Sequence, residues 1–430
     1  MDEPTTTRRG CGAEHGGRRR LRAVSTRIAA AALLGVTAAG LGSNGALSPS
    51  SGSPISGSPN AAATARPAAP ASPTLAQRGG QGRDGRSAQG VPITPAQEEA
   101  TAKGLAWLAR EQNDDGSWTG DVGYKLNSTY QVDRREQPHV GVTALCGMAF
   151  LAGGHLPGRG EYGETLDKTI DFVLGCVDND GYITRSDTRM YSHAFATLFL
   201  AEAYGMTYRQ DLRLKLQKAV DFIVKCQNDE GGWRYEPLAR DSDISIVVCQ
   251  CLALRAARNI GIRVPKSTVD QAIRYVVSSA NKGDAPLRRS ADRDSSPGTF
   301  RYQPQIYSRT EFALTAAGVT ALNGLGIYSD KLIDLGIDYL NSQFFAFNQR
   351  HGHRGHYFFW YGHYYAVQAM YTRGGSDWVN YFTKLRSFLV GHQQADGSWP
   401  NNQGPGLAFS TAMGCLILEI PYDFLPIFHR

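Results

Sequence analysis

The chain has 430 residues, with 45 Lys and Arg against 39 Asp and Glu, which gives a formal net charge of +6. Residues 1–100 carry eleven Arg, no Lys and six acidic residues, so this segment holds +5 of that charge and residues 101–430 hold only +1. A body so close to neutral implies no polyanion-binding face and argues against nucleic acid as a partner.

The N-terminal segment has the layout of an export signal. A basic run from Arg18 to Arg22 precedes a mildly apolar stretch at 28–41. That stretch is too short and too weakly apolar to be a clear membrane span. The alternatives to an export signal are an uncleaved anchor, a misannotated start and a disordered tail. We predict an export signal or anchor at 1–42, a disordered linker rich in Ser, Pro, Gly and Ala at 43–94, and a folded domain at 95–430. The expected location is the periplasm or the cell surface, with the N-terminal segment as a candidate membrane tether.

From residue 95 onward, two kinds of helix are predicted in alternation. The first kind has an apolar stripe on one side, as in Ile170, Val173 and Leu174, whose spacing places them on one helix face. The second kind is apolar nearly all round and must be covered on every side. Six such segments are expected, at 140–152, 194–204, 244–257, 312–325, 363–371 and 407–420. The pattern therefore predicts six outer and six inner helices.

One phrase recurs after outer helices, as QNDDGSW at 112–118, QNDEGGW at 227–233 and QQADGSW at 393–399. Each copy joins a helix end, a Gly turn and an aromatic residue that can plug the gap between neighbouring units, which indicates an array of repeats. The other three units keep the Gly and the aromatic residue. Gly is expected there because it readily adopts the left-handed conformation that ends a helix. The expected turn glycines are Gly116, Gly181, Gly232, Gly298, Gly355 and Gly397, and the expected plugs are Trp118, Tyr182, Trp233, Phe300, Tyr357 and Trp399.

These phrases resemble the QW motifs of the terpenoid cyclase and protein prenyltransferase superfamily. The stretch from Trp360 to Trp399 is similar to bacterial prenyltransferase and squalene oxidase repeat proteins. The resemblance covers roughly residues 95–425. It implies an all-α fold, an α/α toroid in which six inner helices are ringed by six outer ones. Function does not follow from such a fold.

Aligning the six inner helices predicts a ring of polar side chains at one mouth of the toroid. Polar residues collect at helix starts because unpaired N–H groups and the helix dipole favour them there. The same set could instead bind a ligand or transfer protons in an apolar cavity. A third interpretation is a zinc or iron site, although the ligands are scattered in sequence and no particular cofactor is indicated. The residues one helical turn before the aligned position are His139, His193, Asp243, Glu311, His363 and Leu407.

The sequence from Asp241 to Ile244, DSDI, is similar to the DxDD motif of class II terpene cyclases, in which the middle Asp protonates an alkene or epoxide. The resemblance implies Asp243 as the acid, with Asp241 beside it, and apolar surroundings would keep such an acid neutral. However, Ile244 replaces the last Asp, and the chain is too short for the second helical domain of those cyclases. An N-cap role for Asp241 or Asp243 is the alternative. Asp243 and Glu311 could also act as a carboxylate pair on a glycoside.

Aromatic and His residues are densest at 349–365. We expect Trp360, Tyr361 and Tyr364 to wall the cavity and one seam between units, as an isoprenoid site would require. A hydrophobic core would use such residues equally well. A metal site built from the His residues of this segment is a weaker interpretation.

The leading hypothesis is a terpenoid-cyclase-like protein that binds an apolar isoprenoid-type ligand in a central cavity and, if catalytic, transforms it with Asp243 as the acid. In that case His193, Glu311 and His363 would assist. The first alternative is a non-enzymatic interaction module, because the DxDD motif is broken and the second domain is missing. The second alternative is a carbohydrate-processing toroid, which needs an open polar groove. The depth and lining of the central cavity separate the three.

Overall fold

The computed structural model describes residues 89–126, 129–207, 209–283, 296–305 and 307–429. The predicted export signal at 1–42 and nearly all of the predicted linker at 43–94 lie outside these residues, so both stay predictions. Within the part of the chain that is described, no helix is both long enough and apolar enough to cross a bilayer.

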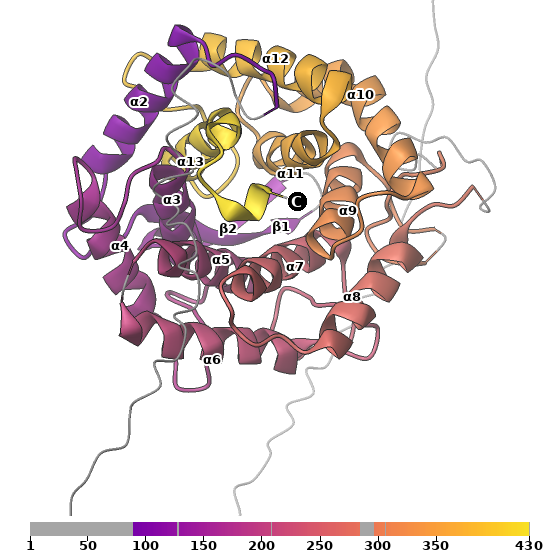
Figure 1. Cartoon of the computed structure of the whole chain (residues 1–430), viewed down its shortest axis with the longest axis horizontal. Coiled ribbons are helices and arrows are strands. Elements are labelled where there is room, and N and C mark those ends of the chain that lie inside the picture. The colour runs from indigo at the N-terminus through magenta and orange to yellow at the C-terminus, as the bar shows by residue number, and fades with distance from the viewer. Residues whose placement is uncertain (1–88, 127–128, 208, 284–295, 306, 430) are drawn as a thin grey trace, which may run out of the picture. The chain divides into compact units, whose positions relative to one another are not determined.

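Six inner helices form a closed ring, in which each helix packs against the next and the last packs back against the first (Figure 1). Their side chains are almost all buried. They are apolar on every side because the ring interior covers one face and an outer layer of helices covers the other. The inner helices are α3 (Val140–Ala152), α5 (Met190–Met206), α7 (Ile244–Asn259), α9 (Phe312–Gly324), α11 (Tyr357–Arg373) and α13 (Leu407–Glu419).

Six outer helices surround the ring, most of them at a seam between two inner helices (Figure 1). Each buries one apolar stripe, as Leu216, Val220 and Ile223 do in α6, and leaves its charged face in solvent. The prediction of six inner and six outer helices is confirmed. The outer helices are α2 (Pro95–Arg110), α4 (Gly163–Gly175), α6 (Gln210–Cys226), α8 (Lys266–Ser279), α10 (Lys331–His351) and α12 (Gly375–His392).

The QW phrases fasten the units together through their Trp and Gln side chains. The Gln amide joins its own Gly turn to the next outer helix. Gln393 Nε2, for example, donates to Gly397 O at 2.9 Å and to Ala100 O of α2 at 2.8 Å, which closes the outer layer on itself. The indole N–H of the Trp in each QW phrase donates to a carbonyl ten residues earlier, at 2.8 Å from Trp118 to Leu108, 2.8 Å from Trp233 to Ile223 and 2.9 Å from Trp399 to Leu389.

Five of the six predicted turn glycines adopt the left-handed conformation, with φ between 62° and 98°. The prediction of Gly232 for the third unit is wrong, because Gly231 takes this conformation there with φ of 87°. A Cβ at residue 231 would lie 2.5 Å from Gln271 O, so the close approach of α8 also requires Gly. Gly232 is needed for a different reason, since its Cβ would lie 2.7 Å from the side chain of Ser242.

A β-hairpin, which the all-α prediction did not include, connects α2 to α3. Its strands β1 (Thr119–Leu126) and β2 (Thr129–Pro138) pair antiparallel. The hairpin runs behind the inner helices in Figure 1. It reaches the start of α11, where the ring of Tyr130 lies 5.9 Å from the ring of Tyr357, and Asp121 N donates to Pro405 O at 2.7 Å. The hairpin therefore lies across the mouth formed by the starts of the inner helices.

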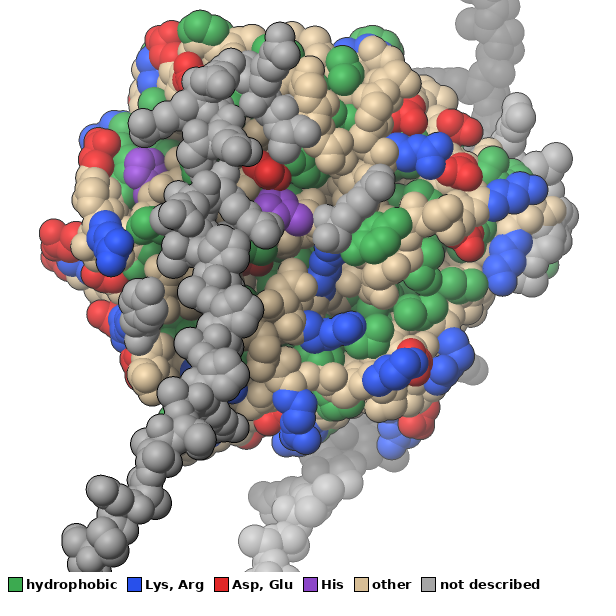
Figure 2. Space-filling view, in the orientation of Figure 1, with side chains coloured by type: hydrophobic (Ala, Val, Ile, Leu, Met, Phe, Trp, Pro, Cys, Tyr) green, Lys and Arg blue, Asp and Glu red, His purple; other side chains and the backbone are tan. Residues whose placement is uncertain are grey.

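The chain's last residues lie at the opposite mouth, where the inner helices end. Two short 3₁₀ turns, η2 (Ile420–Tyr422) and η3 (Pro426–Phe428), lie over the ring, and η3 packs against α7 and α11 (Figure 1). Arg255, near the end of α7, donates to Asn323 O at 2.9 Å and also to the carbonyl of His429. Figure 2 shows this face, on which the visible Lys and Arg side chains are interspersed with Asp and Glu.

Candidate functional site

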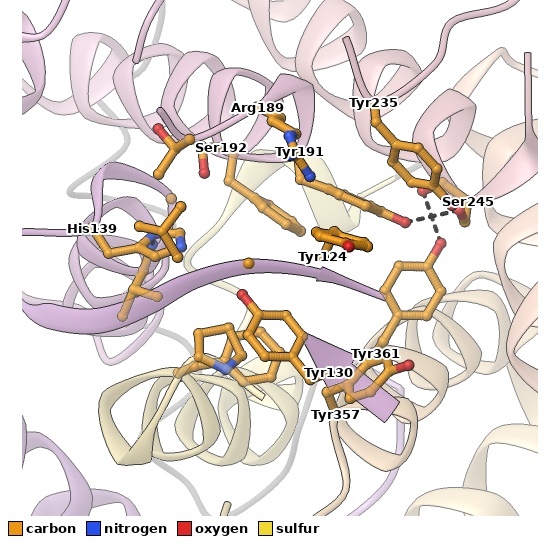
Figure 3. Close-up of a pocket in the computed structure, with 18 of the residues that line it drawn as sticks. Tyr124, Tyr130, His139, Arg189, Tyr191, Ser192, Tyr235, Ser245, Tyr357 and Tyr361 are labelled. Atoms are coloured by element: carbon orange, nitrogen blue, oxygen red, sulfur yellow. Dashed lines mark hydrogen bonds between the residues drawn. The ribbon is translucent and has the colours of Figure 1, made fainter. Parts of the chain in front are cut away.

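A cavity of about 550 Å³ lies inside the ring at the starts of the inner helices, beneath the hairpin (Figure 3). Side chains from the hairpin and from all six inner helices or the loops that precede them contribute to its wall. Most of that wall is aromatic or aliphatic. The aromatic residues are Tyr124, Tyr130, Tyr191, Phe195, Tyr235, Tyr357, Phe358, Tyr361 and Phe409, and the larger aliphatic ones are Val122, Val142, Leu145, Leu314 and Met413.

Ser245, in the first turn of α7, joins two of these tyrosines (Figure 3). The Tyr191 hydroxyl donates to Ser245 Oγ at 2.8 Å, and the Tyr361 hydroxyl donates to Ser245 O at 2.9 Å. Burial raises the pKa of Tyr191 and of Tyr361 well above the ordinary tyrosine value, and it raises the pKa of Tyr235 to about 12. These phenols therefore stay protonated and uncharged at neutral pH.

Arginine–carboxylate pairs lie along the edge of the cavity. Arg189 Nε is 2.6 Å from Glu236 Oε1, and Arg234 Nη1 is 3.3 Å from Asp241 Oδ2. Arg309 Nε is 3.8 Å from Glu311 Oε1. The predicted site residues Asp241 and Glu311 thus both line the cavity, and each has a guanidinium as its neighbour.

Asp243, the predicted acid, is fully buried and does not line the cavity. It is the N-cap of α7, where its Oδ1 accepts hydrogen bonds from Ser245 N at 2.9 Å, from Ile246 N at 3.3 Å and from the Ser245 hydroxyl. Its Oδ2 lies 3.6 Å from Arg234 Nη1. Burial raises the pKa of Asp243, against the opposing effects of the Ser245 hydrogen bond and Arg234. The N-cap alternative therefore describes this residue, and Ser245 separates its carboxyl from the cavity.

The predicted ring of polar residues does not assemble at the cavity. Only His139 and Glu311 of that set line it. His139 is the N-cap of α3, where its Nδ1 accepts from Val142 N at 3.2 Å, and burial lowers its pKa to about 4. Leu407 is 40% exposed and lies outside the lining.

The other two histidines of the set point toward the outer layer. His193 Nδ1 accepts from Ile183 N at 3.0 Å, and its ring lies 5.2 Å from that of Phe222 in α6. His363 is hydrogen bonded to Tyr381 Oη of α12 at 2.8 Å and to Asn348 Oδ1 of α10 at 2.6 Å. Burial lowers the pKa of both histidines to about 3.

The starts of two helices explain this difference. Helix α5 begins at Met190 and α11 at Tyr357, several residues before the predicted starts at 194 and 363. His193 and His363 therefore lie inside helices and not at the mouth, on the face that packs against outer helices.

The aromatic residues predicted at 349–365 divide between the cavity and the core. Tyr361 lines the cavity. Trp360 is buried with its indole N–H directed at Pro400 O at 3.3 Å, and Tyr364 is fully buried within the inner ring. Tyr124 and Tyr130 also line the cavity, although no sequence motif points to them. The signal that could indicate them is the alternation of apolar and polar residues along 119–138, which is typical of strands.

Among the residues that the structure describes, no three His, Cys, Asp or Glu side chains are grouped as metal ligands would be. The metal interpretation of the ring and of segment 349–365 therefore gains no support from the described residues.

The comparison with protein families agrees with this architecture. Residues 90–398 match the Prenyltransferase alpha-alpha toroid domain. The chain belongs to this family. The predicted resemblance to the terpenoid cyclase and prenyltransferase superfamily is thus confirmed, and the prenyltransferase-type toroid spans nearly the whole described region. No curated protein matches the chain.

Solved structures of several activities share this toroid. The GH76A α-1,6-mannanase of Salegentibacter sp. HEL1_6 matches with a TM-score of 0.53 and 10% identity over 75% of this chain and 98% of its own. A novel α-amylase from Clostridium perfringens matches with a TM-score of 0.50 and 9% identity over 75% and 97%. A variant of the type II terpene cyclase MstE from Scytonema, in complex with its substrate geranylgeranyl dihydroxybenzoate, matches with a TM-score of 0.47 and 12% identity over 77% and 98%. At these identities the likeness concerns the fold alone.

Proposed function

We propose that this prenyltransferase-type toroid binds an apolar ligand of the isoprenoid class in its central cavity. The composition of the cavity lining is the main support for this proposal, because the lining is mainly aromatic and aliphatic with a few phenol hydroxyls. Small-molecule sites have this composition, and their volumes of about 300–1,000 Å³ include the 550 Å³ found here. Methyl-branched chains bury apolar area against such walls, and aromatic faces attract any positive charge that develops on them.

A carbohydrate-processing role is less well supported by the same lining. Hydrolysis of a glycoside uses two carboxyl groups that flank the substrate. Asp241 and Glu311 line the cavity, but each is paired with an arginine at its edge. The tyrosines and aliphatic residues between them form an apolar space where a sugar would need polar partners.

The proposal concerns binding, and direct proton transfer from Asp243 is not part of it. The Asp243 carboxyl caps α7 and does not itself line the cavity; its neighbours there are the Ser245 hydroxyl, which is hydrogen bonded to Tyr191, and the Arg234 guanidinium. The polar groups that a ligand would meet on this side are the phenols and Ser245. These would orient a ligand that carries one oxygen atom and leave its hydrocarbon part in the apolar space.

The test is equilibrium binding of farnesol and geranylgeraniol to the purified full chain by isothermal titration calorimetry. A saturable one-to-one interaction is expected. Ala313→Phe adds a ring at a buried residue of the cavity wall and should weaken binding about tenfold or more, equivalent to about 1.4 kcal/mol. The matched control Ala102→Phe adds the same ring on the exposed face of α2 and should leave the affinity unchanged. Absence of binding, or equal affinities for the two variants, would contradict the proposal.

A further inference from the structure

A second cavity, of about 560 Å³, adjoins the first. We call it the vestibule. It is bounded by the hairpin, by the loop that precedes α5 and by the loop after Trp233. The two cavities have a common wall, made by Val122, Asp187, Thr188, Arg189 and Glu236. The two cavities therefore adjoin at these residues.

The vestibule differs from the central cavity in chemistry. The residues that line it and not the central cavity are Asp133, Arg134, Tyr182, Thr184 and Pro237, of which three are charged or carry an aliphatic hydroxyl. The charges are arranged in pairs. Arg134 pairs with Asp187, and Arg189 lies 3.4 Å from Asp133 Oδ2 and 2.6 Å from Glu236 Oε1. Among the described residues of this wall, three carboxylates thus face two guanidinium groups, both of which already have anionic partners.

Arg189 stands at the boundary between the two cavities. It is the N-cap residue of α5, and its side chain is 33% exposed. Its guanidinium lies 5.2 Å from the centre of the Tyr124 ring, which lines the central cavity. Of its two ion-pair partners, Asp133 lines the vestibule alone and Glu236 lines both cavities. In Figure 3 Arg189 lies beside Tyr191 at the edge of the tyrosine cluster. A ligand that passes Arg189 leaves an apolar region and enters a polar one.

Unusual backbone conformations gather around the vestibule. Of the five non-glycine residues with positive φ in the described chain, four lie in the three segments that bound it. Such conformations persist only where the surrounding structure imposes them, and they cluster at ligand-binding sites. The four residues are Glu136 (φ 51°), Ser186 (φ 55°), Asp187 (φ 64°) and Leu238 (φ 57°).

We propose that the two cavities form one site for an amphiphile, with an isoprenoid-class tail in the central cavity and an uncharged, hydroxyl-bearing head in the vestibule. This inference rests on the function proposed above. A hydroxyl group both donates and accepts, so it can bind a guanidinium and a carboxylate of the same ion pair. A phosphate or diphosphate head would instead bring negative charge next to Asp133, Asp187 and Glu236.

The experiment compares three probes with one tail on the purified full chain, namely farnesol, farnesyl β-D-glucoside and farnesyl diphosphate, by isothermal titration calorimetry. The glucoside should bind about tenfold more tightly than farnesol, because its head adds hydrogen bonds in the vestibule. The diphosphate should bind more weakly than the glucoside. A glucoside no tighter than farnesol, or a diphosphate tighter than the glucoside, would overturn the inference.

Variants separate the head site from the tail site. The double substitution Asp133→Asn with Arg134→Gln removes one charge of each sign from the vestibule wall, and it should lower the glucoside affinity to that of farnesol while leaving farnesol binding unchanged. Arg135→Gln is the matched control, because this side chain is 80% exposed and lines neither cavity. If farnesol binds and the double variant affects neither probe, the head site is wrong and the tail site stands. If no probe binds, the proposed function fails, and this inference fails with it.

Discussion

The phenol of Tyr191 donates a 2.8 Å hydrogen bond to the hydroxyl of Ser245. Ser245 in turn donates to Asp243 Oδ1, so a residue of the cavity wall is joined to the buried cap of α7. The same carboxylate oxygen accepts two backbone N–H groups of that helix. Asp243 therefore holds the start of α7 and, through Ser245, the position of Tyr191. Asp243 is therefore a structural residue, and its replacement should lower the free energy of unfolding.

Substitutions at Asp243 should affect stability according to whether the new side chain can cap the helix. Asp243→Asn retains an oxygen acceptor and should lower the free energy of unfolding by less than about 1 kcal/mol. Asp243→Ala removes the cap and leaves Arg234 without one of its two carboxylate neighbours, so a loss of about 1–3 kcal/mol is expected. Urea denaturation followed by circular dichroism measures both values. Equal losses for the two variants would contradict a capping role.

The left-handed turn glycines should not tolerate Ala. Gly397 has φ of 98°, and a Cβ there would lie 2.5 Å from Lys103 O. Gly397→Ala should therefore destabilise the protein by more than about 1 kcal/mol. Gly391, six residues earlier, lies within α12 and has no atom within 4 Å of an added Cβ, so Gly391→Ala should be neutral or stabilising by up to about 1 kcal/mol. Melting temperatures of the two variants test the contrast.

The indole N–H of the QW tryptophans should contribute to the stability of the fold in addition to the packing of the ring. Trp233→Phe removes ring volume and leaves Ile223 O without this donor. The control Trp378→Phe removes the same volume from a fully buried Trp whose Nε1 has no hydrogen-bond partner among the described residues. The first substitution should cost about 1 kcal/mol more in unfolding free energy than the second. Chemical denaturation of both variants measures the difference, and a larger loss at Trp378 would refute the role of the N–H.

Glu202, a buried residue near the end of α5, should make the stability of the protein depend on pH. Its side chain is buried, and burial raises its pKa to about 8 from 4.5. Between these pH values the folded chain keeps a proton that the unfolded chain has lost, so this residue's contribution to stability falls as pH rises from about 4.5 to about 8. Glu202→Gln removes that dependence. The melting temperature of this variant minus that of the unmodified protein should therefore increase as the pH is raised through this window. The control Glu230→Gln, on the exposed surface, should show no such increase.

The architecture could be predicted because its signals are local. The Trp of each QW phrase binds a carbonyl ten residues earlier, and the Gly turn lies between the two, so one short stretch contains the whole connection. Repetition of that stretch, together with six helices apolar on all sides, predicted the alternation of outer and inner helices, and the resemblance to QW-motif proteins implied the toroid. Even here the choice between Gly231 and Gly232 depended on the approach of α8, which local sequence does not specify.

The site depended on contacts between distant segments. Its wall combines the hairpin with residues from around the whole ring, which are separated by up to nearly three hundred positions. The orientations of His193, Asp243 and His363 depend on where each helix begins and on how it packs against its neighbours. None of the three lines the cavity. The sequence alone thus determined the repeat unit, because its hydrogen bonds are short-range. Only the tertiary structure decided the cavity lining, since the packing of segments far apart in the chain sets which side chains meet.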